Sequence, residues 1–207
     1  MLLAFTSLGV ITYEVITHAT LAAMDVPAIM WAHAHRSAAI TAVAHIASWT
    51  GGPLISSAYV AIVVIFCLAR HQFATAAGVA TIVLGGAGLN VALKHLVQRA
   101  RPVVDDPLVS LSTYSFPSGH AAATTVFGGL LIMLMFRSRA EIGQRALAIW
   151  AIVFWVLCVF ASRIYLGAHY PTDVLAGLAE GIGWLALSSL VLDRWRVPLI
   201  WPRRRAL

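Results

Sequence analysis

Three short segments of the sequence combine residue types that bind and transfer phosphate groups. In the first, Lys94 lies seven residues before Arg101, which is followed by Pro102, at the end of an apolar stretch. Cations in such a position commonly anchor a helix by extending their charged groups toward the lipid headgroups. The pair therefore indicates phosphate binding only if the other two segments lie beside it.

The second segment is Phe116-Pro117-Ser118-Gly119-His120, which opens another apolar stretch. We predict that Pro117 occupies the first turn of a helix, which would leave the backbone N–H groups of the next three residues free to bind an anion. The Ser118 hydroxyl adds a donor, and the His120 ring can hydrogen-bond an ester oxygen. Taken alone, this pattern also fits a histidine at a membrane interface.

The third segment runs from Ser162 to Asp173 and contains Arg163, His169 and Pro171. Pro171 predicts a helix start, which places Asp173 in the first turn, within reach of His169. A carboxylate that fixes one imidazole nitrogen leaves the other free to act as a base or nucleophile. Arg163 adds a planar guanidinium that can bind two phosphate oxygens at once.

The elements that carry these segments are predicted to be membrane-spanning helices. Of the 207 residues, 60% are hydrophobic and 11% are charged, and the mean hydropathy of +0.86 is far above that of a soluble domain. A span needs about 20 apolar residues, and six stretches approach this length: 1–24, 52–69, 73–93, 119–136, 146–162 and 172–192. Because no linker or repeat divides the chain, we predict one all-α integral membrane domain over residues 1–207.

The predicted architecture is a six-transmembrane-helix bundle with an interfacial helix after the first span. Residues 25–49 differ from the spans because His33, His35, Arg36 and His45 interrupt a partly helical apolar pattern. Such a segment is typical of a helix that lies along the membrane surface. The Gly51-Gly52-Pro53 run would end it.

This layout predicts that the three segments meet in space. The first two flank the loop between the third and fourth spans, and the third occupies the loop between the fifth and sixth. Loops that are two connections apart emerge on the same side of a membrane, whether or not the first span is complete. Together the segments would supply three cations, a cluster of backbone amides, two histidines and one carboxylate, which suits phosphoryl transfer.

The distribution of Lys and Arg predicts the orientation. Nine of the fourteen lie on the side opposite the three segments, namely Arg70, Arg137, Arg139, Arg145, Arg194, Arg196, Arg203, Arg204 and Arg205. Cytoplasmic loops carry the excess of positive charge, so both termini are expected in the cytoplasm and the three segments outside it. Glu14 and His18, with no basic region before them, favour a retained first helix over a cleaved signal peptide.

Several other residues are expected to be structural. Glu14 and Glu180 lie within spans and should face the bundle interior. The GxxxG step of Gly177 and Gly181 is interpreted as a helix contact, and Gly85, Gly86 and Gly88 should likewise allow close approach of the third span.

Features that could indicate other functions have simpler interpretations. Asp105 and Asp106 are expected in a solvated loop, and the His33 and His35 pair at the interface rather than on a metal. Cys67 and Cys158 lie in apolar runs, where neither a disulfide framework nor a thiolate metal site is expected. The cations are spread along the chain, which argues against a nucleic acid partner.

The combined pattern K-x6-RP, PSGH and SR-x5-H-x3-D resembles the type 2 phosphatidic acid phosphatases, whose superfamily also contains vanadium haloperoxidases and bacterial acid phosphatases. It is present without departure from Lys94 to Pro102, Pro117 to His120 and Ser162 to Asp173. The resemblance implies a metal-independent lipid phosphatase without a cofactor, in which His169 attacks phosphorus, Asp173 orients it and His120 protonates the leaving oxygen. The implied phosphate-binding residues are Lys94, Arg101, Ser118, Gly119 and Arg163.

Two other enzyme classes share these residues. A lipid phosphotransferase would pass the phosphate to an acceptor other than water, and a haloperoxidase would hold vanadate in the same cation pocket, although those relatives are soluble. A membrane scaffold or transporter would be expected to have lost motif residues. Among lipids, undecaprenyl pyrophosphate, phosphatidylglycerol phosphate, phosphatidic acid and lipid A phosphates all fit, and a bacterial cell membrane is the expected location.

Overall fold

The computed structural model describes residues 1–138 and 140–194, so Arg139, Arg196 and Arg203 to Arg205 lie outside the described residues. The described part of the chain is all-helical and contains no strand. Its helices are α1 (Leu2–Thr17), α2 (Thr20–Ala23), α3 (Asp25–Ala34), α4 (Ala38–Thr50), α5 (Pro53–Ala69), α6 (Phe73–Val97), α7 (Gly119–Arg137), α8 (Ile142–Tyr165) and α9 (Pro171–Arg194).

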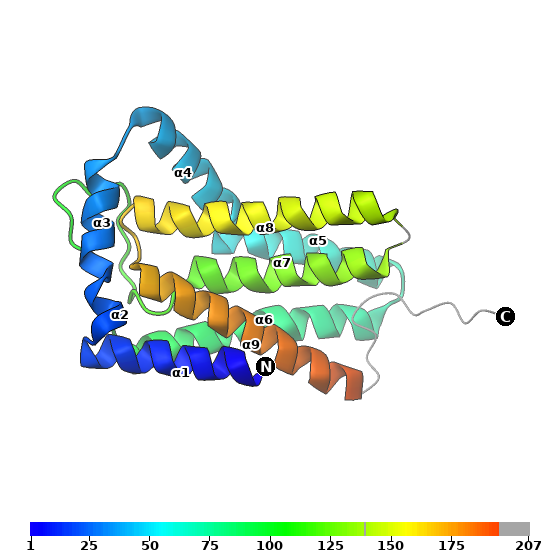
Figure 1. Ribbon diagram of the computed structural model, residues 1–207. Coiled ribbons are helices and arrows are strands. Elements are labelled where there is room, and N and C mark those ends of the chain that lie inside the picture. The colour runs from blue at the N-terminus through cyan, green and yellow to red at the C-terminus, as the bar shows by residue number, and fades with distance from the viewer. Residues whose placement is uncertain (139, 195–207) are drawn as a thin grey trace.

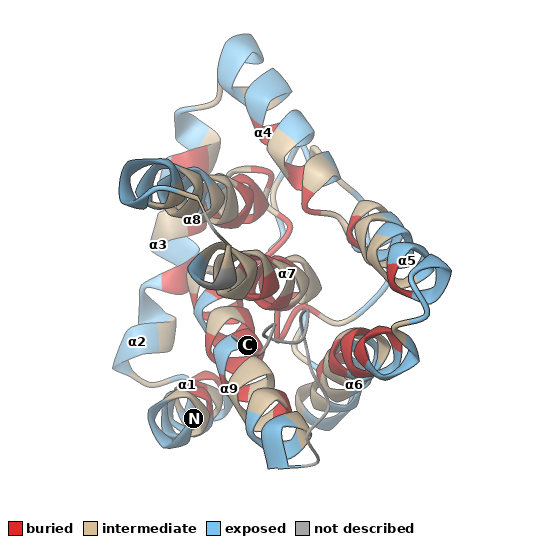
Figure 2. Cartoon of the chain, turned by 90° about the vertical axis from the view of Figure 1, so that its right-hand side faces the viewer, coloured by how far each residue is buried: buried red, intermediate tan, exposed pale blue. Residues whose placement is uncertain are grey.

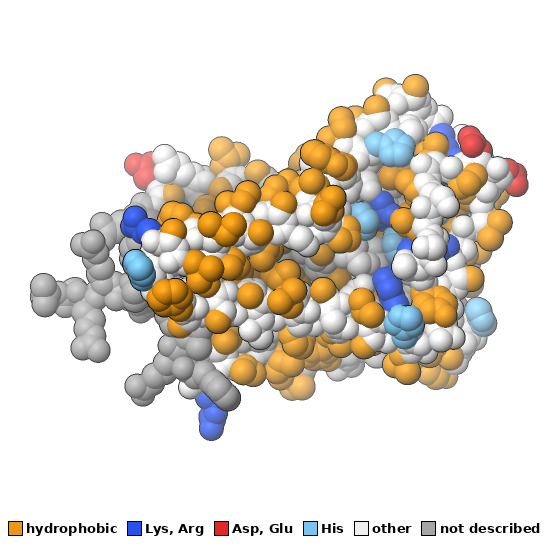
Figure 3. All heavy atoms as spheres, turned by 180° about the vertical axis from the view of Figure 1, so that it is seen from behind, with side chains coloured by type: hydrophobic (Ala, Val, Ile, Leu, Met, Phe, Trp, Pro, Cys, Tyr) orange, Lys and Arg blue, Asp and Glu red, His pale blue; other side chains and the backbone are white. Residues whose placement is uncertain are grey.

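Four helices are long and apolar enough to cross a membrane: Phe73–Val97, Gly119–Phe136, Ile142–Tyr165 and Pro171–Arg194. They match the last four predicted spans. The first two predicted spans correspond to bent helix pairs, Leu2–Thr17 with Thr20–Ala34 at 65° and Ala38–Thr50 with Pro53–Ala69 at 41°. The number of spans is therefore four, or up to six if each bent pair is one span. Figure 3 shows the hydrophobic surface that extends between the two ends of the molecule.

The first helix is shorter than the predicted span over residues 1–24. It ends at Thr17 because His18 adopts a left-handed conformation with φ 53°. The Glu14 carboxylate then accepts a hydrogen bond from the Leu21 N–H at 2.8 Å, at the start of α2. The prediction that Glu14 faces the bundle interior is therefore wrong: this half-buried carboxylate caps the next helix.

The predicted interfacial helix over residues 25–49 is two helices. The chain breaks after Ala34, and the Ser37 hydroxyl caps α4 by accepting from the Ile40 N–H at 3.3 Å. Helix α3 lies across one end of the bundle, over α8 and α9, whereas α4 packs along α8 and continues into α5 through the bend at Gly51 and Gly52 (Figure 1).

Helix α7 lies at the centre of the bundle, in contact with α5, α6, α8 and α9. Figure 2 shows buried residues where α7 meets α8 and α9. The GxxxG prediction is confirmed, because a Cβ added to Gly177 would lie 2.6 Å from the Ser118 carbonyl oxygen, and one on Gly181 would lie 2.7 Å from Thr125 Cβ. These two glycines let α9 approach the first turns of α7, where the second segment is located.

Candidate active site

The two loops that carry the three segments lie together at one end of the bundle (Figure 1). The end of the α6–α7 loop is joined to the first turn of α9 by a hydrogen bond from the Ser118 N–H to the Asp173 carbonyl oxygen at 2.9 Å. The prediction that the segments meet is therefore confirmed. Figure 3 shows Lys, Arg and His side chains around a hollow at this end.

Arg101 and His169 form the centre of the site. Arg101 Nη1 lies 3.3 Å from His169 Nε2 and donates to the Ala168 carbonyl oxygen at 2.7 Å. A guanidinium can only donate, so His169 Nε2 is the acceptor and Nδ1 carries the proton of the neutral ring. The lone pair of Nε2 therefore lies beside a cation that can also hold an oxygen of the group under attack.

Asp173 lies on the other side of the His169 ring. The distance from His169 Nδ1 to Asp173 Oδ2 is 3.5 Å, which is an ion-pair distance rather than a good hydrogen bond. Asp173 Oδ2 accepts shorter bonds from the Ser115 hydroxyl at 2.5 Å and the Tyr170 N–H at 2.9 Å. The fold thus places Asp173 where its position along α9 predicts, and Ser115 stands beside both partners.

The sequence reasoning missed a salt-bridge network behind Asp173. Arg99 donates to Asp173 Oδ1 at 2.6 Å and to Asp25 Oδ2 at 2.7 Å. Asp25, from α3, also accepts from the Thr172 N–H at 3.0 Å and from the Thr172 hydroxyl at 2.5 Å. The first motif contains Arg99, but no spacing in the sequence indicates that Arg99 pairs with Asp25, which lies 74 positions earlier.

Burial sets the protonation of the central groups. Desolvation lowers the pKa of His169 to about 4, against an opposing effect of Asp173, so the ring is neutral at neutral pH. Burial also lowers the pKa of Arg101, again partly offset by Asp173. For Arg99 burial acts in the same sense, but the carboxylates of Asp173 and Asp25 outweigh it and raise its pKa. Both arginines stay charged.

The other two predicted cations reach the same end of the bundle in different environments. Lys94 Nζ donates to the carbonyl oxygens of Tyr114 and Pro117, each at 2.8 Å. Arg163 is 2% exposed and donates through Nη1 to the Ser48 hydroxyl. Its Nε is buried without a hydrogen-bond partner in the described part of the chain. Arg163 therefore has a donor without a protein partner in the described residues, while Lys94 also holds the α6–α7 loop.

The second segment differs from its prediction in detail. Helix α7 begins at Gly119 with Ser118 as the N-cap, so Pro117 lies before the helix rather than in its first turn. The Ser118 N–H is not free, since it donates to Asp173, and the Ser118 hydroxyl accepts from the Ala121 N–H at 3.4 Å. Of the three backbone N–H groups predicted to bind an anion, only those of Gly119 and His120 therefore remain candidates.

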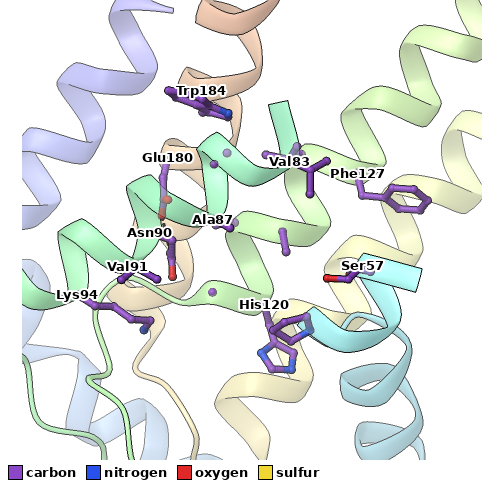
Figure 4. Close-up of a pocket in the computed structure, with 18 of the residues that line it drawn as sticks. Ser57, Val83, Ala87, Asn90, Val91, Lys94, His120, Phe127, Glu180 and Trp184 are labelled. Carbon is purple, nitrogen blue, oxygen red and sulfur yellow. Dashed lines mark hydrogen bonds between the residues drawn. The ribbon is translucent and has the colours of Figure 1, made fainter. Parts of the chain in front are cut away.

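A cavity of about 430 Å³ opens from these residues toward the middle of the bundle. Its lining includes Lys94, Arg101, Gly119, His120 and His169 at one end and Glu180 and Trp184 at the other, between α5, α6, α7 and α9. Most of the remaining lining side chains are apolar. Figure 4 shows Lys94 and His120 at one end of the group of lining residues and Trp184 at the other.

The alternative polar features stay outside this cavity. Asp105 and Asp106 are exposed in the α6–α7 loop, as predicted. His35 Nδ1 lies 2.8 Å from the Trp31 carbonyl oxygen of its own helix. Among residues 1–138 and 140–194, no group of three or more His, Cys, Asp or Glu residues is arranged to hold a metal ion.

Comparison with known proteins places this site in context. A sequence model described as the PAP2 superfamily matches residues 73–196. A lipid A 1-phosphatase of Rhizobium etli is 35% identical over 121 residues, covering 54% of this chain and 47% of the relative. A decaprenylphosphoryl-5-phosphoribose phosphatase of Mycobacterium tuberculosis is 37% identical over 109 residues, covering 47% and 54%. The chain thus spans about half the length of the curated relatives it matches.

A solved structure shares the fold over nearly the whole chain. It is a transmembrane PAP2-type phosphatidylglycerolphosphate phosphatase from Bacillus subtilis, with a TM-score of 0.83 and 20% sequence identity, and the match covers 99% of this chain and 98% of that one. The two bent helix pairs, the first of which includes α3, are therefore part of a known arrangement.

Proposed function

This chain belongs to the PAP2 superfamily, and from that membership and the geometry of the site we propose that it is a metal-independent lipid phosphatase. The observation that carries the proposal is the cavity that joins His169 and Arg101 to an apolar interior. A lipid phosphate can place its head beside the cations at one end of the cavity and its chain among the apolar side chains toward the other end. A soluble phosphate ester has no apolar chain to place in the apolar part of the cavity.

In the proposed reaction His169 is the nucleophile. Its Nε2 forms a bond to phosphorus while the bond from phosphorus to the leaving oxygen breaks, and His120 gives that oxygen a proton. Asp173 stabilises the ring as Nδ1 becomes part of a cation. Water then attacks the phosphohistidine, His120 takes a proton from it, and the bond between Nε2 and phosphorus breaks to release inorganic phosphate.

The charge that develops on the nonbridging oxygens would be held by preorganised donors. Arg101 is already beside Nε2, Arg163 has an unpartnered Nε, and Lys94 has one N–H beyond the two that bind the loop. The Gly119 amide completes the set. Ser118, whose hydroxyl caps α7, is proposed to act mainly by fixing that amide in place.

We further propose that the site faces the extracytoplasmic side of a bacterial cell membrane. Arg70, Arg145 and Arg194 lie at the end opposite the site. At the site end, Arg99 and Arg101 make the contacts described above rather than forming a free positive surface. The relatives act on lipid A and a decaprenyl lipid by name, and undecaprenyl pyrophosphate, phosphatidylglycerol phosphate and phosphatidic acid are the further candidates.

The test is phosphate release by the purified full chain from a panel of these lipids, in EDTA and with or without vanadate. We expect release from at least one lipid in EDTA, inhibition by vanadate, and a loss on the order of 100-fold in Arg101→Ala, as for one transition-state donor. Activity that depends on added magnesium would refute the mechanism. Transfer of the phosphate to a lipid or sugar acceptor, instead of its release, would identify a phosphotransferase.

A further inference from the structure

Glu180 is a buried acid that the proposed reaction does not use. It lies on α9 within a membrane-spanning segment, is 1% exposed, and lines the cavity. Its Oε2 accepts a hydrogen bond from Asn90 Nδ2 at 2.8 Å. Its Oε1 is buried and has no hydrogen-bond partner in the described part of the chain. Because a buried polar atom without a partner is costly, this oxygen needs an explanation.

Asn90 holds Glu180 in a fixed position between the phosphate-binding end of the cavity and Trp184. Asn90 is also buried, and its Oδ1 lies 3.2 Å from the point where a Cβ on Gly119 would be. It is thus wedged between the start of α7 and the carboxylate. Figure 4 shows Asn90 and Glu180 between Lys94 on one side and Trp184 on the other.

The described side chains around Glu180 Oε1 leave this oxygen without a protein donor, so a ligand in the cavity could supply one. Several lining side chains carry donors, among them Lys94, Ser56 and Ser57, but none of them hydrogen-bonds Oε1 in the described part of the chain. Trp184 closes the far end, but its indole N–H donates to the Ile82 carbonyl oxygen at 2.6 Å and does not serve Glu180. A donor that binds Oε1 from within the cavity would therefore belong to the molecule that fills it.

The depth of Glu180 identifies the part of a lipid that reaches it. Along α6, Asn90 is one helical turn from Lys94 in the direction of the bundle interior, and along α9, Glu180 is seven residues from Asp173 in the same direction. At the rise of an α-helix, these separations place the pair roughly 6 to 10 Å from the phosphate-binding groups. At this depth lies the linkage between the head of a lipid and its chains. Ester linkages offer only acceptors, whereas amide linkages and hydroxyl groups offer a donor.

We propose that Asn90 and Glu180 form a second polar binding site of the cavity, which accepts a hydrogen bond from an amide N–H or hydroxyl in the linkage region of the lipid. The inference rests on the proposed function, because it assigns the substrate class of the same cavity. It makes the chain selective for amide-linked or hydroxylated lipid phosphates over their ester-linked counterparts. A site built to bind a donor discriminates against an analogue without one, since its acceptor is then left buried and unpaired.

The experiment compares two synthetic lipids with identical acyl chains, a 3-(acylamino)propyl phosphate and a 3-(acyloxy)propyl phosphate. For hydrolysis by the wild-type chain, kcat/KM is expected to be on the order of 10-fold higher for the amide, because the ester leaves the buried acceptor unpaired. In Glu180→Leu the ratio should fall to about one, and in Glu180→Gln to an intermediate value. Ser188→Ala, a buried polar position on α9 outside the cavity lining, is the matched control and should keep the wild-type ratio.

Binding of both lipids to His169→Ala separates this inference from the proposed function. That variant cannot form the phosphoenzyme, so its dissociation constants report the cavity alone, and tighter binding of the amide is expected. Preference for the amide in binding without hydrolysis by the wild type would support the site and refute the phosphatase. Equal dissociation constants for the amide and the ester would overturn the second site. So would a preference for the amide that persists in a folded Glu180→Leu. Neither outcome would contradict the proposed phosphatase activity.

Discussion

Arg99 Nη1 lies 2.6 Å from Asp173 Oδ1, and through this ion pair the α6–α7 loop fixes the carboxylate beside the proposed nucleophile. The same guanidinium binds Asp25 Oδ2 at 2.7 Å and stacks on the Tyr170 ring at 4.2 Å. Asp173 is thereby held from α3, from the loop and from its own helix. Its orientation depends on a segment that precedes all three motifs.

The first prediction is that Asp25 is a positioning residue for Asp173. In Asp25→Asn the amide loses its ion pair with Arg99 and retains only one acceptor oxygen for the two Thr172 donors. We expect kcat to fall roughly 10- to 100-fold with KM little changed, as small displacements of catalytic groups do. Asp105→Asn, at an exposed carboxylate of the α6–α7 loop, is the control. A normal kcat in Asp25→Asn would show that the position of Asp173 does not depend on Asp25.

The second prediction concerns the acid side of the pH profile. His169 attacks as the neutral ring, and burial lowers its pKa to about 4. The reactive form is thus present above that pKa and is lost as the pH falls through it. After correction for the second ionisation of the phosphate ester, near pH 6, the acid limb of kcat/KM that reports His169 should therefore lie near pH 4. An acid limb centred at the ordinary histidine value of about 6.5 would contradict the burial of the ring.

The third prediction separates the two histidines. His169→Ala should be inactive on every substrate, because no phosphohistidine can form. His120→Ala should retain far more activity on an activated aryl phosphate, whose leaving group needs no proton, than on an alkyl phosphate lipid. The measurement is the pair of rate ratios, with an acid-labile, base-stable label trapped from radioactive substrate. Equal losses in both variants on both substrates, and no label in the wild type, would remove the assigned roles.

The fourth prediction is the orientation of the chain. With Cys67 and Cys158 replaced, a single cysteine at the exposed Ser110 should react with an impermeant maleimide in intact cells. The matched control is Gly143→Cys at the opposite end, where an added Cβ meets nothing within 4 Å. It should react only after permeabilisation. The reverse labelling pattern would place the site in the cytoplasm.

The sequence by itself determined which residues form the centre of the site and that they meet. The three motifs fix residue types, and the alternation of membrane helices brings loops that are two connections apart to one face. The position of Asp173 at a helix start, four residues after His169, follows from local geometry. These features depend on spacing within one element or on the order of elements, both of which a sequence displays.

Only the tertiary structure decided which distant side chains complete the site. Asp25 pairs with Arg99, and Asn90 with Glu180, because the rotation of each helix and the path of the loop bring those atoms together. The same packing assigns the Ser118 N–H to the Asp173 carbonyl oxygen. No periodicity encodes such pairs, since each contact depends on side chains from separate elements that adopt their relative positions only when the whole bundle is packed.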